Sequence, residues 1–150
     1  MSENTPQPIS YNKRTPREIM MFTEFICEVY SEIEKPKWSN DSHAEIGFYE
    51  KNKTTGSNIF FGIWYEAWEF FGIPLCITLD YGGNSVTDKY NQIRKHIESK
   101  NEAGLYYKEF QDFALILFDH EFFNFKNDTD RLVTMYTELR NLVDIKTFSK

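Results

Sequence analysis

The chain has 150 residues, the usual length of one domain, and it can build a core that needs neither a metal nor a disulfide for stability. Its 17 basic and 23 acidic side chains give a net charge of −6, which argues against nucleic-acid binding, because phosphates require clustered cations. No stretch approaches the roughly 20 apolar residues of a membrane span. The polar first ten residues lack the apolar segment of a signal peptide, so we expect a cytoplasmic protein.

A long helix is predicted at the start of the domain, after a polar, proline-containing lead-in at residues 1–14. Thr15 followed by Pro16 is typical of the N-cap and first position of a helix. Apolar residues then recur at spacings of three and four as far as Ile33. Pro36 ends this helix.

Two strands, a short helix and a third strand are predicted next. Residues 44–51 and 58–63 flank a turn cluster and are typical of a strand hairpin. In residues 64–71 aromatic side chains repeat at helical spacing, and Gly72 is a typical helix stop, although a continuing strand is the alternative. The apolar, β-rich residues 75–80 predict a buried strand.

The remaining part of the chain predicts a helix, a second hairpin and a last helix. The helix starts near Ser85 and ends before Gly104. Residues 105–110 and 113–118 predict two strands joined by a tight turn. Apolar residues at helical spacing predict the last helix over residues 128–142.

The order of these elements, α-β-β-α-β-α-β-β-α, predicts the fold class. Two hairpins favour an α+β fold with a mostly antiparallel sheet of about five strands, packed with three main helices. We interpret residues 15–150 as a single domain, since no linker divides them.

Aromatic residues provide the best candidate for a binding surface, because the chain has 14 Phe, 9 Tyr and 3 Trp. A short helix that buries Trp64, Trp68 and Phe71 would direct Tyr65 and Phe70 to its polar side. Exposed aromatic side chains concentrate at interfaces. We therefore predict binding by Tyr65, Phe70, Trp64 and Trp68. The alternative is a large aromatic core in which Tyr65 is partly solvated.

Three carboxylates provide an alternative, catalytic site. Asp80 ends one predicted strand, and Asp119 and Glu121 follow another. If that strand continued, Asp119 and Glu121 would project to one face. With Asp80 they would then hold a divalent cation for metal-assisted hydrolysis. No spacing enforces this meeting, so we expect neither a resident metal nor a cofactor.

The two cysteines, Cys27 and Cys76, both lie in apolar segments. Free cysteine in such a setting usually behaves as a small buried hydrophobic residue. The sequence leaves a disulfide between them open. Neither cysteine has cationic neighbours that would activate it as a nucleophile.

The segment Phe61-Gly62-Ile63-Trp64-Tyr65-Glu66-Ala67-Trp68, continued by Phe71-Gly72-Ile73-Pro74-Leu75, resembles accessory regions of some bacterial PD-(D/E)xK nuclease-like proteins. The nuclease motif itself is not recognisable in this chain, so no catalytic residue is carried over. The resemblance implies a non-catalytic module from a bacterial or mobile-element setting.

We therefore expect a non-catalytic binding or regulatory module that recognises another macromolecule, a protein, through an acidic and aromatic-rich surface. A metal-dependent hydrolase is the first alternative. The second is a structural protein that self-associates as a homodimer, because a second copy can cover an apolar patch.

Overall fold

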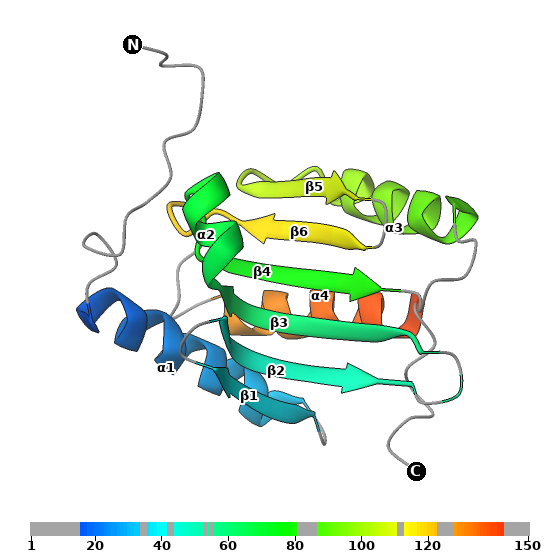
Figure 1. Cartoon of the computed structure of the whole chain (residues 1–150). Coiled ribbons are helices and arrows are strands. Elements are labelled where there is room, and N and C mark those ends of the chain that lie inside the picture. The colour runs from blue at the N-terminus through cyan, green and yellow to red at the C-terminus, as the bar shows by residue number, and fades with distance from the viewer. Residues whose placement is uncertain are drawn as a thin grey trace.

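The computed structural model describes residues 16–33, 36–41, 44–52, 54, 56–80, 87–110, 113–122 and 128–142; the predicted lead-in and Thr15 lie outside them. The elements are α1 (Pro16–Glu32), β1 (Lys37–Asp41), β2 (Glu45–Lys51), β3 (Asn58–Trp64), α2 (Tyr65–Phe71), β4 (Leu75–Asp80), α3 (Thr87–Lys100), β5 (Leu105–Glu109), β6 (Ala114–Phe118) and α4 (Thr129–Leu142). The strands form an antiparallel six-stranded sheet of order β1-β2-β3-β4-β6-β5 (Figure 1). The predicted α+β fold is confirmed, with six strands rather than about five.

The additional strand is β1, which the sequence pattern does not predict. Its five residues include a single large apolar side chain, that of Trp38. That ring packs edge-on against Tyr30 of α1, with 5.3 Å between the ring centroids. Because β1 is an edge strand, it is ordered by backbone pairing with β2 along one side, and this pairing needs no alternation of apolar residues.

Helices α1, α3 and α4 pack together on one face of the sheet and bury the main core. The predicted apolar stripe of α1 is confirmed by the burial of Phe22, Ile26 and Val29. Alternate residues of the strands complete this core, including Ile46, Phe48, Ile59, Phe61, Ile77 and Ile116. None of the helices described is long and apolar enough to cross a membrane.

A buried carboxylate, Glu50, joins the sheet to α4. Glu50 lies on the core side of β2 and is 2% exposed. The Tyr136 hydroxyl donates a 2.7 Å hydrogen bond to Glu50 Oε1, and Arg140 Nη1 lies 3.3 Å from the same oxygen. A buried charge is costly unless it is paired, so Tyr136 and Arg140 of α4 make the burial of Glu50 in the core possible.

A second polar contact joins α3 to α4 nearer the surface. Lys100 Nζ and His96 Nε2 each lie 2.8 Å from Glu138 Oε1. Burial by itself would raise the pKa of Glu138, but the hydrogen bonds from Lys100 and His96 outweigh it and lower that pKa. The ionised form of Glu138 therefore stabilises the packing of the two helices.

The short helix α2 lies at one end of the sheet, where β3 ends, and on the near side in Figure 1. It ends at Gly72 as predicted. Gly72 has a φ of 77°, and its N–H donates a 2.8 Å hydrogen bond to the Trp68 carbonyl. Glycine adopts this left-handed conformation at little cost, so Gly72 closes the helix and turns the chain towards β4.

Candidate functional site

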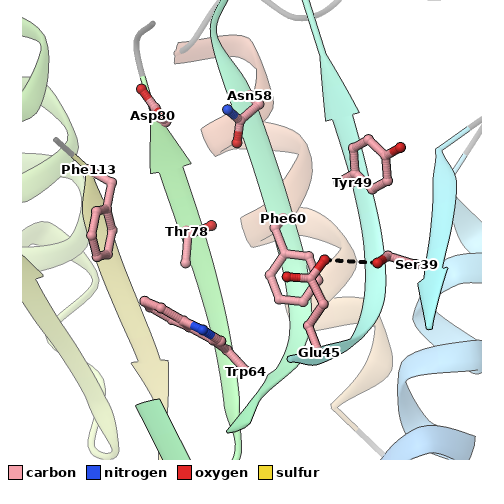
Figure 2. Close-up of a pocket in the computed structure, with 9 residues that line it drawn as sticks. All are labelled: Ser39, Glu45, Tyr49, Asn58, Phe60, Trp64, Thr78, Asp80 and Phe113. Carbon is pink, nitrogen blue, oxygen red and sulfur yellow. Dashed lines mark hydrogen bonds between the residues drawn. The ribbon is translucent and has the colours of Figure 1, made fainter. Parts of the chain in front are cut away.

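The second face of the sheet carries no long helix among the described residues, and it is hollowed. Figure 2 looks onto this hollow, which has a volume of about 540 Å³. We call it the sheet hollow. Its lining comes from five strands or their ends, namely Ser39, Glu45, Tyr49, Asn58, Phe60, Trp64, Thr78, Asp80 and Phe113.

Strand register explains why these side chains meet. Successive residues of a strand point to opposite faces, and directly opposed residues of neighbouring strands share a face. Glu45 of β2 is opposite Trp64 of β3, and Tyr49 is opposite Phe60. Thr78 of β4 continues the row on the other side of Phe60. All of these residues therefore point away from the main core.

Two buried glycines lie between the Glu45–Trp64 and Tyr49–Phe60 pairs that line the sheet hollow. Gly47 and Gly62 are directly opposed on β2 and β3. The strands approach so closely here that a Cβ on Gly62 would lie 2.2 Å from the Ile46 carbonyl oxygen. A Cβ on Gly47 would also meet the Phe60 ring, at 2.9 Å. The Phe60 ring therefore packs over the Gly47 backbone, and any side chain at either glycine would collide with its neighbours.

The charged side chains among the described lining residues of the sheet hollow are two carboxylates, Glu45 and Asp80. The Ser39 hydroxyl donates a 2.8 Å hydrogen bond to Glu45 Oε2, which orients the Glu45 side chain (Figure 2). Asp80 is opposite Asn58, whereas Glu45 is opposite Trp64, at the other end of the same strand. At about 3.3 Å per residue, the backbones that carry the two carboxylates are roughly 20 Å apart along β3. The nine described lining residues include no Lys, Arg or His.

Cys76 lies on the same face of the sheet as the hollow, opposite Gly62 in the register of β3 and β4, and it is buried in a cluster with Phe60, Leu115 and Leu117. Burial strongly raises the pKa of the Cys76 thiol, and the nearby Glu45 charge raises it further. Cys76 is therefore a protonated thiol at neutral pH and a poor nucleophile. Cys27 is exposed, which corrects the expectation that both cysteines are buried, and both are free.

An aromatic groove continues from the sheet hollow towards α2. It has a volume of about 410 Å³ and is lined by Trp64, Glu66, Ala67, Phe70, Phe71, Phe110, Phe113 and Leu115. Trp64 and Phe113 line both the groove and the sheet hollow, and their rings pack edge-on at 5.6 Å. Phe70 is 62% exposed and Phe110 is 41% exposed. This groove therefore presents large apolar side chains to solvent.

The structure corrects two of the predicted binding residues, Tyr65 and Trp68, which are both buried in the main core. Phe70 is exposed as predicted, but Tyr65 is buried in the main core, where its ring stacks on that of Trp68. Trp64 belongs to β3, and the helix begins only at Tyr65. Tyr65 and Trp68 are therefore three residues apart on one face of α2, and this face packs towards Phe22 of α1.

The predicted cluster of Asp80, Asp119 and Glu121 does not assemble. Residue 75, at the start of β4, is opposite residue 118, so Asp119 lies beyond that start, whereas Asp80 is the last residue of the strand. Beyond residue 118 the chain turns, and Asp119 Oδ1 accepts a 3.0 Å hydrogen bond from the Glu121 N–H. Within the described ranges, no group of three or more His, Cys, Asp or Glu side chains is arranged to hold a metal ion.

Most of the sheet hollow was not predicted from the sequence. The signal is an alternation along β2 and β3. Polar, glycine and aromatic residues occupy every second position, and the positions between them are apolar except for Glu50. The missed residues are Ser39, Glu45, Tyr49, Asn58, Phe60, Thr78 and Phe113.

Comparisons of the chain with protein-family models, with curated proteins and with solved structures give no match. The likeness to nuclease accessory regions therefore stays a prediction. The function has to be inferred from the open face of the sheet.

Proposed function

We propose that this protein is a non-catalytic binding module that recognises another protein through the open face of its sheet. The main support is the aromatic groove, in which Phe70 and Phe110 are exposed beside the half-buried Trp64 and Phe113. Contiguous exposed aromatic surface is typical of interfaces, because buried rings supply much of the binding energy. A cytoplasmic location and a bacterial or phage origin stay predictions.

The acidic character of the chain supports a protein partner over a nucleic acid. The net charge is −6, and the open face carries Glu45, Asp80 and Glu66 in or beside the two cavities. Phosphate groups would be repelled by such a surface. A basic protein surface would be attracted to it and steered into contact.

Substitution of the exposed rings tests this proposal. Phe70→Ala and Phe110→Ala each remove an exposed side chain and should leave the fold intact, whereas each should weaken partner binding by about thirtyfold if the ring is a hot spot. Met20→Ala is the control, because Met20 is 64% exposed on α1, away from the open face. The measurement is affinity purification from cells that naturally contain the protein, followed by calorimetry with the partner recovered. Equal recovery with all three variants would refute the proposed surface.

Self-association is the second candidate, and the same groove favours it. An exposed apolar groove on one copy can be covered by the corresponding groove of another in a symmetric dimer. Light scattering of the purified chain distinguishes the two proposals. If the chain is a dimer that Phe70→Ala converts to a monomer and Met20→Ala leaves intact, the partner at this groove is a second copy of the chain and not another protein.

A further inference from the structure

We propose that the sheet hollow binds a cationic side chain, lysine or arginine, carried by a basic segment of the protein partner. This inference rests on the proposed function and specifies the chemistry of the partner. It concerns Glu45, Trp64 and Phe60 around the paired glycines, whereas the proposed function rests on the aromatic groove.

The sheet hollow, with a volume of about 540 Å³, has space for a ligand. Gly47 and Gly62 carry no side chains, so nothing from these two opposed positions fills the hollow between the Glu45–Trp64 pair and the Tyr49–Phe60 pair. Glu45 is directly opposite Trp64, and Figure 2 shows both at the same end of the hollow. A lysine or arginine side chain fits within this volume.

The side chains that line the sheet hollow can bind a cation in two ways. The faces of Trp and Phe rings attract an ammonium or guanidinium group through their quadrupoles. A carboxylate accepts short, strong hydrogen bonds from the same groups. The Ser39 hydroxyl occupies one position on Glu45 Oε2, and a carboxylate has about four acceptor positions, so Glu45 retains capacity for a ligand.

The charges of the described lining residues favour a cation over an anion. Glu45 and Asp80 line opposite ends of the sheet hollow, and none of its described lining residues is basic. The Glu45 charge also acts on Cys76, which is buried on the same face of the sheet, where it adds to the effect of burial in raising the pKa of the Cys76 thiol. Glu45 itself is half-buried, which strengthens its attraction to a cation relative to a fully solvated carboxylate.

The length of the sheet hollow favours a chain segment over a single small ion. The strand positions of its two carboxylates are roughly 20 Å apart, so one ion cannot contact both. An extended peptide of about six residues has the same length. We therefore expect a basic peptide to lie along the strands, with one cationic side chain beside Glu45.

Short synthetic peptides provide the test with the full chain. Hexalysine and hexaarginine are titrated into the protein, and hexaglutamate and the neutral sugar cellohexaose serve as comparisons. The readouts are calorimetry and the NMR signal of the Trp64 indole N–H, assigned with Trp64→Phe. We expect saturable binding of the two basic peptides with a shift of the Trp64 signal, and no binding of hexaglutamate. A Trp64 shift with cellohexaose but not with hexalysine would overturn the inference in favour of a carbohydrate site.

A matched pair of charge variants separates the local contact from general attraction. Glu45→Gln keeps the shape of the side chain and should weaken hexalysine binding by about tenfold or more, since it removes a charge-assisted hydrogen bond. Glu28→Gln removes the same charge from the exposed side of α1 and should change binding less than about twofold. Equal effects of the two variants, or no effect of either, would overturn the inference. Circular dichroism confirms that both variants are folded.

The outcomes also distinguish this inference from the proposed function. If hexalysine does not bind but Phe70→Ala abolishes capture of the native partner, only the cationic site is wrong. If Phe70→Ala and Phe110→Ala retain the native partner, the proposed function is wrong, whatever the peptides do.

Discussion

Replacing Tyr136 with Phe isolates the contribution of one buried hydroxyl to the packing of α4 on the sheet. Tyr136 is fully buried, and its hydroxyl donates to Glu50 at 2.7 Å. Phe keeps the ring and its edge-on contact with Phe48, at 5.2 Å between centroids. A hydrogen bond to a charged group contributes about 1.5–3 kcal/mol. Because Arg140 still lies 3.3 Å from the carboxylate, we expect a loss near the lower end of that range.

The same substitution should also change how stability depends on pH. Burial raises the pKa of Tyr136 well above its ordinary value, and the charge and hydrogen bonding of Glu50 raise it further, although Arg140 opposes this. Above about pH 10 the unfolded chain loses the tyrosine proton while the folded protein keeps it, so the stability of the natural protein falls. Tyr136→Phe lacks this loss. The stability difference between the two proteins should therefore shrink by roughly 1 to 1.5 kcal/mol between about pH 9 and pH 11.

Urea unfolding followed by circular dichroism measures both effects. Tyr106→Phe is the control, because Tyr106 is 42% exposed on the edge strand β5, and the change should cost less than about 0.5 kcal/mol. A cost below about 0.5 kcal/mol for Tyr136→Phe at neutral pH would contradict the role of the hydroxyl. A stability difference that stays constant from about pH 9 to pH 11 would contradict the raised pKa.

Three further predictions concern the glycines, the cysteines and the contact between α3 and α4. Gly62→Ala should lower the free energy of unfolding in urea by about 3 kcal/mol or more, because its Cβ would lie 2.2 Å from a carbonyl oxygen. Gly72→Ala should lower it by only about 1 kcal/mol, since no atom lies within 4 Å of its Cβ position. Equal losses for the two variants would contradict this. Brief treatment with a thiol reagent should label the exposed Cys27 and spare Cys76, which mass spectrometry will show; equal labelling rates would place Cys76 at the surface. Lys100 and His96 of α3 lower the pKa of Glu138, so the stability that ionised Glu138 contributes should be lost as pH falls below about 4. Glu138→Gln should therefore reduce the decline of stability in acid. An unchanged dependence of stability on acid pH would show that the contact contributes nothing.

Elements with strong local signals were predicted correctly. The long helix α1 carries apolar residues at helical spacing, and Gly72 marks the end of α2. Each depends on neighbours within a few positions along the chain, so a linear pattern is enough to predict it. The edge strand β1 has no such pattern, because a single side of it pairs and only Trp38 packs on the core.

Errors arose where a boundary or a distant contact decides the outcome. Tyr65 was expected at the surface because the helical spacing was counted from Trp64, but Trp64 ends β3 and the helix frame starts one residue later. Asp80 and Asp119 were considered as one cluster because both follow apolar strands. Their strands, β4 and β6, are antiparallel neighbours, which places the two residues at opposite ends.

The sequence by itself determined the class of fold, most of the helices and strands, and which side of each helix is apolar. These properties are local, since they follow from the period of apolar residues and from the conformational preferences of Gly and Pro. Only the tertiary structure decided that Glu45, Phe60 and Trp64 border one hollow above a pair of glycines. These residues lie together because of the register of separate strands and because three helices cover the opposite face of the sheet. No single segment of the chain encodes either property.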